Sequence, residues 1–268
     1  MTTIKYDSSG AAQWLERYNG PENGGDRGLS ISVDSSGNVY VGGASVGRGT
    51  GADCVIIKYD LNGARQWLDV YNGPGNDADW ISDMALDSSG NIYLSGYGAG
   101  LGTGNDYLTF KYSGTGAREW LQRYDGPAHG DEMTHAIAVD GSGNVYVTGY
   151  STYADDNKDY VTIKYDTQGG RKWIKRYNGL GNGLDEAYDI ALDGSGNVYV
   201  TGRSVGLNGH EDFVTIKYGK RGTQIWTRIY DGPANWDDDA YSVAVDSWGN
   251  VYVAGFSTGI FTDMDCTT

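Results

Sequence analysis

Apolar and polar residues alternate along the chain in short runs, which Gly-rich and Asp-rich segments separate. A representative stretch contains four such runs, at 29–33, 38–45, 54–59 and 66–71. A period of two is typical of β-strands, and the 3.6-residue period of an amphipathic helix does not persist over any useful length. The sequence therefore predicts an all-β protein built from short strands.

The segments between these runs have the composition of tight turns. Asp34-Ser-Ser-Gly-Asn38 joins the first two runs, and Asp60-Leu-Asn-Gly63 joins the last two. An aspartate can accept hydrogen bonds from nearby backbone N–H groups, and glycine can adopt a left-handed conformation. We expect hairpins at both places, and the first segment lacks the alternating oxygen ligands of a calcium loop.

The whole pattern recurs every 53 residues without an insertion or a deletion. The recurring tryptophans are Trp14, Trp67, Trp120, Trp173 and Trp226. Four strands in about fifty residues, repeated in tandem, are the signature of a propeller blade. We predict a single domain over residues 1–268, a five-bladed β-propeller with four antiparallel strands per blade.

The two ends of the chain predict how the ring closes. Residues 2–6 have the pattern of a third strand, whereas the last hairpin, 241–257, has the pattern of a first and a second strand. We therefore expect two N-terminal and two C-terminal strands to share the last blade, which leaves no open sheet edge. Residues 265–268 also align with 53–56, an overlap typical of a piece of a longer array or of a permuted design.

Two segments resemble a known repeat family. Asp140-Gly-Ser-Gly-Asn-Val-Tyr-Val-Thr-Gly-Tyr-Ser151 and Asp159-Tyr-Val-Thr-Ile-Lys-Tyr165 are similar to the bacterial SBBP-type β-propeller repeat. The resemblance implies a propeller fold and says little about function. It also implies an extracellular or cell-surface location, although this chain shows no signal peptide.

Charge and composition restrict the partners that we expect. The net charge is −15, and such an acidic surface repels nucleic acid and anionic membranes. No apolar run has the length of a membrane span. We expect a monomer that binds no nucleic acid and does not insert into membranes, with Cys54 and Cys266 as free thiols.

Acidic residues recur at two positions of the repeat. The first set precedes the innermost strand of each blade and consists of Asp26, Asp79, Glu132, Asp185 and Asp238. These carboxylates would surround the mouth of the central channel, where a bound Ca²⁺ would relieve their repulsion. Alternatively, each accepts hydrogen bonds within its own loop. The second set precedes the third strand, where we expect turn caps: Asp53, Asp106, Asp159, Asp212 and Asp265.

Aromatic residues that do not follow the repeat are the candidates for ligand binding. They lie in or beside the longer loops and include Trp80, Trp236, Tyr153, Tyr188 and Tyr241. Exposed rings beside carboxylates are typical of sugar recognition. The alternative is local packing of scattered loop residues. The repeated Trp, Tyr and Lys residues, in contrast, are expected to belong to the framework.

These observations favour a non-catalytic scaffold or interaction module. The sequence does not identify its ligand, and a glycan or a protein is the candidate partner. A lectin-like carbohydrate-binding protein is the alternative. A glycan-cleaving enzyme is a third hypothesis, for which Asp83 and Asp189 break the symmetry of the innermost strands. Such an enzyme needs two carboxylates in different environments, whereas the repeat supplies nearly identical ones. We expect no enzyme activity and no cofactor other than the Ca²⁺ considered above.

Overall fold

The computed structural model describes residues 1–153, 157–260 and 264–268, and every regular element in these ranges is a β-strand. The chain divides into two compact units, Met1–Asp125 and Gly126–Thr268, which we call unit 1 and unit 2. In the described ranges there is no helix that could cross a membrane.

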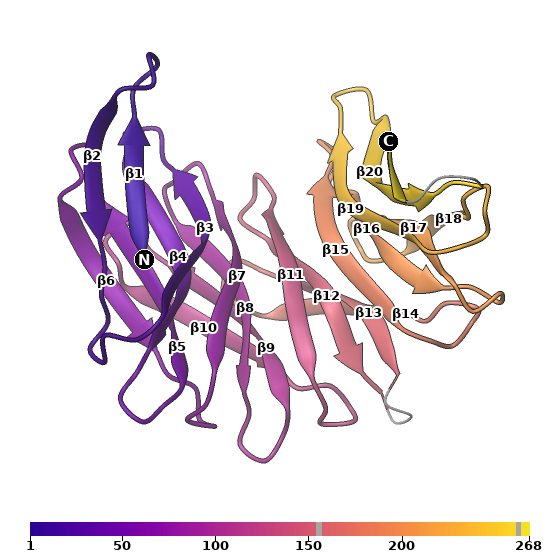
Figure 1. Cartoon of the computed structure of the whole chain (residues 1–268), viewed down its shortest axis with the longest axis horizontal. Helices are drawn as coiled ribbons and strands as arrows, with labels where there is room; N and C mark the ends of the chain where they lie inside the picture. The colour runs from indigo at the N-terminus through magenta and orange to yellow at the C-terminus, as the bar shows by residue number, and fades with distance from the viewer. Residues whose placement is uncertain (154–156, 261–263) are drawn as a thin grey trace. The chain divides into compact units, whose positions relative to one another are not determined.

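Unit 1 contains a two-stranded sheet, β1-β2, and two four-stranded sheets, β3-β4-β5-β6 and β7-β8-β9-β10 (Figure 1). Each sheet is an antiparallel meander. The strands are β1 (Thr2–Tyr6), β2 (Ala12–Arg17), β3 (Asp26–Val33), β4 (Val39–Val46), β5 (Ala52–Tyr59), β6 (Arg65–Tyr71), β7 (Asp79–Leu86), β8 (Ile92–Ala99), β9 (Asn105–Tyr112) and β10 (Arg118–Tyr124).

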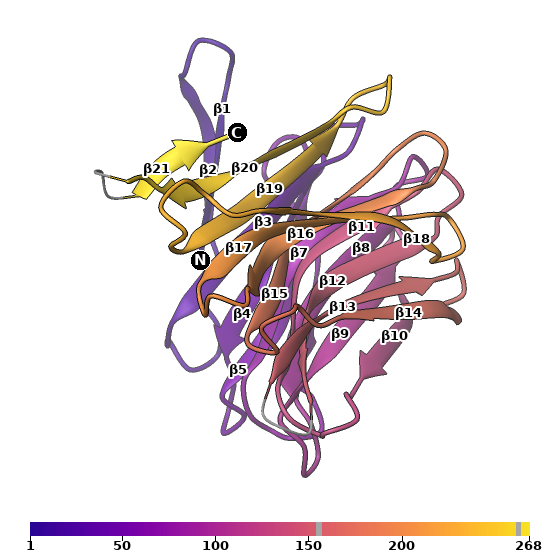
Figure 2. The same cartoon turned by 90° about the vertical axis from the view of Figure 1, so that its right-hand side faces the viewer.

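Unit 2 contains two four-stranded sheets, β11-β12-β13-β14 and β15-β16-β17-β18, and the three-stranded sheet β19-β20-β21 (Figure 2). The strands are β11 (Glu132–Val139), β12 (Val145–Thr152), β13 (Lys158–Tyr165), β14 (Arg171–Tyr177), β15 (Asp185–Leu192), β16 (Val198–Val205), β17 (Glu211–Tyr218), β18 (Gln224–Tyr230), β19 (Asp238–Val245), β20 (Val251–Thr258) and β21 (Met264–Thr267).

The four-stranded antiparallel unit predicted from the sequence is confirmed. The main difference is that the first strand begins earlier: β3 starts at Asp26 rather than at residue 29. A β-bulge interrupts each first strand at the same place, for example between Gly28 and Ser30 in β3. The first acidic set therefore belongs to the strands and not to the loops before them.

The predicted hairpin turns are also confirmed. In the turn after β11, Asp140 accepts hydrogen bonds through Oδ1 from the N–H groups of Ser142 and Asn144, and through Oδ2 from the hydroxyl of Tyr146. Gly143 has a φ of 77°, a conformation that favours glycine. One aspartate thus binds both the turn and a buried tyrosine of the following strand.

The repeated Trp and Lys residues connect successive sheets inside each unit. Trp67 of β6 and Lys58 of β5 both donate to the carbonyl oxygen of Gly114, in the turn between β9 and β10. The indole of Trp67 also lies against Gly116, where a β-carbon would come within 2.8 Å of the ring. In unit 2, Trp173 and Lys164 contact the carbonyl of Lys220 in the same way. The framework role predicted for these residues is confirmed, since they connect neighbouring sheets.

Apolar side chains from neighbouring sheets form the core of each unit. In unit 1 the cluster includes Tyr40, Ile56, Ile81, Leu94 and Phe110. The cluster of unit 2 combines residues from β11 to β17 in the same manner. The core of each unit is therefore sheet-on-sheet packing, as expected for blades.

The last sheet differs from the prediction. β20 pairs with β21 and β1 pairs with β2, so in the described ranges no sheet combines strands from both chain ends. β21 contacts β20 only from Gly255 to Thr258, and Val251–Ala254 has no strand on that side. β21 supplies only the beginning of a third strand, because residues 265–268 align with 53–56.

Candidate functional site

The first acidic set is buried at the beginning of the first strands. Asp79, Glu132, Asp185 and Asp238 have no exposed surface, and Asp26 is half-buried. Asp185 and Asp238 accept hydrogen bonds at 2.7 and 2.6 Å from the N–H groups of Gly179 and Gly232, six residues earlier. Asp26 and Asp79 bind their loops in the same way. The geometry matches the loop-capping alternative of the sequence analysis.

The second acidic set lies close to the first, because the start of a third strand faces the start of the next sheet. Burial raises the pKa of Asp79 to about 6, with a contribution from the charge of Asp53. Burial likewise raises the pKa of Asp185 to about 6, with a contribution from Asp159. The sequence did not predict that the two sets meet, since their members are 26 residues apart.

In unit 2, an arginine neutralises one of these carboxylate pairs. The guanidinium of Arg176, in β14, forms an ion pair with Asp159. The equivalent Arg123 of unit 1 pairs with Asp106 at 2.6 Å. One repeat after Arg176, the same position holds Ile229, which provides no charge.

In the repeat that contains Ile229, three acids lie close together. Single oxygens of Asp212, Asp231 and Asp238 lie within 4.8 Å of one another. They belong to the start of β17, the segment after β18 and the start of β19. Burial, together with the charges of Asp231 and Asp238, raises the pKa of Asp212 to about 6. We call these three residues the acidic triad.

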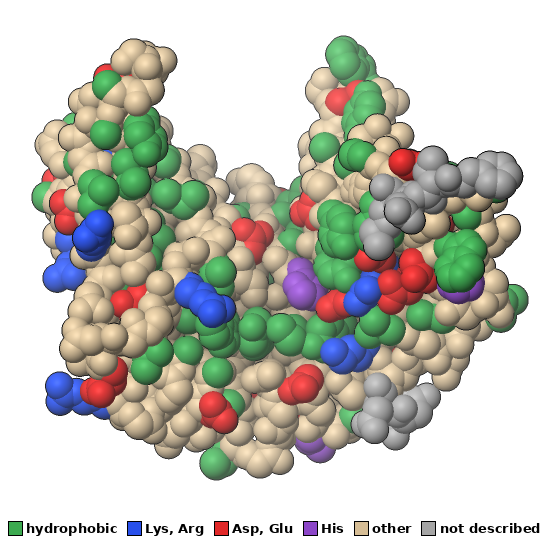
Figure 3. Space-filling view, in the orientation of Figure 1, with side chains coloured by type: hydrophobic (Ala, Val, Ile, Leu, Met, Phe, Trp, Pro, Cys, Tyr) green, Lys and Arg blue, Asp and Glu red, His purple; other side chains and the backbone are tan. Residues whose placement is uncertain are grey.

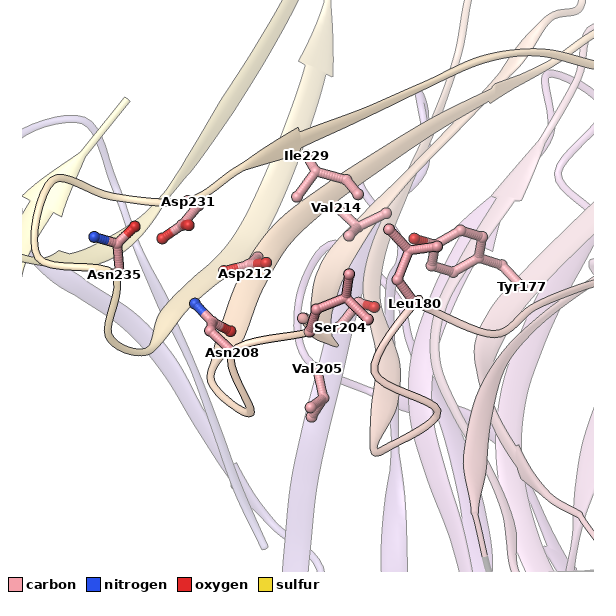
Figure 4. Close-up of a pocket in the computed structure, with 12 residues that line it drawn as sticks. Tyr177, Leu180, Ser204, Val205, Asn208, Asp212, Val214, Ile229, Asp231 and Asn235 are labelled. Carbon is pink, nitrogen blue, oxygen red and sulfur yellow. The ribbon is translucent and has the colours of Figure 1, made fainter.

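A pocket of about 390 Å³ opens beside the acidic triad. Figure 4 shows Asp212, Asp231, Asn208 and Asn235 at one end of this pocket, and Tyr177 and Leu180 at the other. One end therefore offers carboxylate and amide groups, whereas the other is apolar.

A second cluster in unit 2 surrounds Arg203 of β16. Its guanidinium lies 2.8 Å from Glu186 and 2.8 Å from Glu211, and 3.9 Å from Asp239. His135 contacts the other oxygen of Glu186 at 3.1 Å. Three carboxylates thus converge on a single guanidinium.

Aromatic rings adjoin this charged group. The ring centroids of Tyr188 and Tyr241 are 5.3 Å apart, and Tyr188 lies 5.4 Å from His135. Tyr188 donates a hydrogen bond to Glu186, and Tyr241 donates one to Asp239. On the right-hand side of Figure 3, basic, acidic and histidine side chains lie next to hydrophobic ones. The members of this Arg203 cluster are His135, Glu186, Tyr188, Arg203, Glu211, Asp239 and Tyr241.

The electrostatics of the Arg203 cluster differ from one carboxylate to the next. Burial alone would raise the pKa of Glu186, but hydrogen bonds and charges from His135 and Arg203 outweigh it and lower the pKa to about 2. Burial raises the pKa of Glu211 and of Asp239, although Arg203 opposes it in both. Glu186 is therefore the most firmly ionised carboxylate of the cluster.

The structure brings together two of the five aromatic residues proposed for ligand binding. Tyr188 and Tyr241 belong to the Arg203 cluster. Tyr153 covers the guanidinium of Arg176 at 3.5 Å, and Trp236 lies 4.8 Å from His210. Trp80, in unit 1, contacts Arg27. The charged members of the cluster were not identified from the sequence, although a signal exists: the position of Arg203 varies freely between repeats, as Ala44, Tyr97, Tyr150, Arg203 and Phe256.

Asp83 and Asp189, considered for the enzyme hypothesis, connect neighbouring first strands. Asp83 accepts a hydrogen bond from the hydroxyl of Ser30 at 3.3 Å, from the previous sheet. Asp189 accepts bonds from the hydroxyl of Ser242 and the N–H of Val243, in the following sheet. Both carboxylates therefore form hydrogen bonds that connect neighbouring sheets.

Comparison with known proteins identifies the repeat. Residues 126–155 and 172–208 match the family SBBP, described as a β-propeller repeat. These two segments are SBBP β-propeller repeats. No curated protein matches the chain.

Solved structures with the same architecture have unrelated activities. A crystal structure of a eukaryotic initiation factor is 9% identical and has a TM-score of 0.52, covering 96% of this chain and 56% of its own. A glucose dehydrogenase, also 9% identical, has a TM-score of 0.51 and covers 94% of this chain and 86% of its own. The SBBP chain spans little more than half of the initiation factor. At this identity the similarity concerns the fold alone.

Proposed function

We propose that this SBBP-repeat chain is a non-catalytic interaction module, monomeric and built on a closed five-bladed β-propeller. The observation that carries the proposal is the Arg203 cluster, in which aromatic and charged groups occupy variable positions of an otherwise repeated framework. Repeat scaffolds bind partners through such positions, because the framework residues are needed for packing.

The chemistry of the Arg203 cluster favours binding over catalysis. Glu186, Glu211 and Asp239 all contact the same guanidinium, whereas glycoside hydrolysis needs two carboxyl groups on either side of a bond. Three carboxylates outnumber one arginine, and Tyr188 and Tyr241 offer ring faces. A basic side chain of a protein partner suits this combination through charge and cation–π contacts.

A lectin-like protein is the second candidate function, and the paired tyrosines favour it. Stacking of a sugar on the rings of Tyr188 and Tyr241, with hydroxyl hydrogen bonds to Asp239, follows ordinary carbohydrate recognition. Because the repeat position of Tyr188 and Tyr241 holds Leu29, Ser82 and His135 in the other repeats, this hypothesis predicts one principal glycan site.

Two side chains support closure of the ring, because they are exposed whereas their equivalents in the other repeats are buried. Tyr252 is 58% exposed, whereas the tyrosines at this position in four other repeats are at most 1% exposed. Ile31 is 59% exposed, whereas its equivalents are at most 7% exposed. Pairing of β1 with Val251–Ala254 and packing of the completed blade against β3 would bury both residues.

The Trp and Lys connection between sheets supports the same closure. By repeat spacing, Trp226 and Lys217 would donate to the carbonyl of Ser8, in the turn between β1 and β2. Gly10 of that turn has open space beside it, whereas Gly63, Gly116 and Gly222 lie against a tryptophan. The turn is thus shaped to receive the indole of Trp226.

Binding and hydrolysis assays on the full chain test the proposed function. The matched variants are Tyr188→Ala with Tyr241→Ala, and Trp248→Ala as a control on an exposed turn. We expect no glycan hydrolysis and no binding on a glycan array. Basic peptides should bind, and loss of both tyrosines should weaken that binding at least about tenfold. Glycan binding that the tyrosine variants abolish would favour the lectin, and hydrolysis that Asp189→Asn abolishes would contradict the proposal.

A further inference from the structure

The acidic triad in unit 2 contains one residue that departs from the repeat. Asp231 stands where three other repeats have Asn19, Asn72 and Asn178, and one has Asp125. In those three repeats the asparagine amide donates to another asparagine four residues later, at 2.5 to 2.8 Å. A carboxylate cannot donate that bond. The carboxylate of Asp231 accepts no hydrogen bond from the described part of the chain, so a local structural role does not explain it.

Asp212 is a buried carboxylate without hydrogen bonds. It is 7% exposed, and its Oδ1 atom is completely buried with no partner in the described residues. Asp53 and Asp106, at the same position, each accept a threonine hydroxyl, but this repeat has no threonine there. A buried ionised oxygen without a partner is costly, so it requires a compensating group.

The protein itself supplies no permanent positive charge at this place. Within the described ranges, no Lys or Arg forms an ion pair with Asp212, Asp231 or Asp238, and the position of Arg176 holds Ile229. His210, whose charge would favour the ionised form of Asp212, contacts Asp237 instead, at 3.3 Å.

We propose that Asp212, Asp231 and Asp238 bind a divalent cation, with Ca²⁺ as the ion that their chemistry fits best. Ca²⁺ binds six to eight oxygens at about 2.3–2.6 Å, so two of its ligands can be about 5 Å apart. The mutual distance of 4.8 Å in the acidic triad is compatible with one shared ion. Water completes the coordination from the adjoining pocket, where Asn208 and Asn235 offer further amide oxygens.

The ion would connect two sheets of unit 2. Asp212 belongs to the sheet β15-β16-β17-β18, and Asp238 begins β19 of the next sheet. The cation would thus supply the positive charge that Arg176 supplies beside Asp159 one repeat earlier. The inference is independent of the partner that binds the Arg203 cluster.

Calorimetry and thermal unfolding of the metal-stripped full chain test the site, with CaCl₂ as the probe and MgCl₂ for comparison. We expect Ca²⁺ to bind and to raise the unfolding temperature. Asp231→Asn installs the residue of three other repeats, so it should fold and should weaken one binding site at least about tenfold. Glu22→Gln removes an exposed charge of unit 1 and should change nothing.

A second variant tests the exchange between arginine and metal. Ile229→Arg places a guanidinium where Arg176 neutralises Asp159. It should raise the unfolding temperature without metal and reduce the increase that Ca²⁺ produces. Absence of Ca²⁺ binding at millimolar concentration, or equal binding by the parent, Asp231→Asn and Ile229→Arg, would overturn the proposal. Tyr188→Ala with Tyr241→Ala should bind Ca²⁺ normally, which separates this site from the proposed function.

Discussion

At the scale of the residue, the aspartates of this chain have two opposite roles. The turn aspartates, such as Asp140, collect hydrogen bonds that outweigh the effect of burial and lower their pKa. The strand aspartates, such as Asp79, are buried with fewer bonds, and their pKa rises to about 6. The first group stabilises the fold at neutral pH, whereas ionisation of the second group lowers the stability of the fold.

Replacing a turn aspartate should destabilise the protein strongly. Asp140→Ala removes the acceptor for two backbone N–H groups, the amide of Asn144 and the hydroxyl of Tyr146, so we expect a loss of about 3 kcal/mol in unfolding free energy at neutral pH. The loss should shrink as pH falls below about 4, where the parent carboxylate becomes protonated. Chemical denaturation measures it, and Ser142→Ala in the same turn is the control. A loss below about 0.5 kcal/mol would contradict this role.

Replacing a strand aspartate should have the opposite pH dependence. The pKa of Asp79 in the folded state, about 6, exceeds its ordinary value of 3.8. Between these values the folded state binds more protons than the unfolded state, so this group lowers stability as pH rises from about 4 to about 6. Asp79→Asn keeps an oxygen for the N–H of Gly73 and removes the charge. Relative to the parent, it should be more stable at about pH 8 than at about pH 4, and a difference independent of pH would refute the account.

At the scale of the element, neighbouring sheets are joined by one tryptophan and one lysine that contact the same carbonyl. In unit 1, Trp67 also stacks on Tyr112 of the next sheet, with 6.2 Å between ring centroids and 15° between ring planes. The connection requires glycine at position 116, where φ is 90° and the indole lies against the backbone. This explains why Trp, Lys and Gly recur together in the repeat.

Removing the tryptophan should therefore weaken sheet packing and not only the strand that carries it. Trp67→Ala is expected to cost about 3 kcal/mol or more, because a large ring and its hydrogen bond to Gly114 are lost together. Trp248→Ala, on an exposed turn, should cost almost nothing and serves as the control. Equal thermal unfolding of the two variants would show that the indole does not connect the sheets.

The strands and hairpins could be predicted from the sequence because each repeat contains its own alternation and turn residues. The placement of Asp26 and its equivalents was less accurate, since a polar residue at the start of a strand interrupts the apolar pattern. The meeting of Asp212 with Asp231 and Asp238 depends on packing between sheets, which the repeat does not encode as a local pattern. The exchange of Arg176 for Ile229 was visible in the sequence, but its meaning required the structure.

At the scale of the whole molecule, the central claim is that β1 and β2 complete the last sheet of a closed propeller. β21 ends after four residues, and the edge of β20 beyond it extends over Val251–Ala254. By repeat spacing, the partners of this edge are Thr3, Ile4, Lys5 and Tyr6. Closure within one chain yields a monomer, whereas the same pairing between copies yields a strand-exchanged oligomer.

Residue-resolved hydrogen exchange of the monomer in solution tests this claim most directly. The amides to compare are those of Val251–Ala254 that point away from β19 and those of Thr3–Tyr6 that point away from β2. If the ring is closed, they exchange as slowly as the equivalent amides of β12 and β13, because they are bonded inside a four-stranded sheet. Exchange at the rate of an open sheet edge would contradict closure.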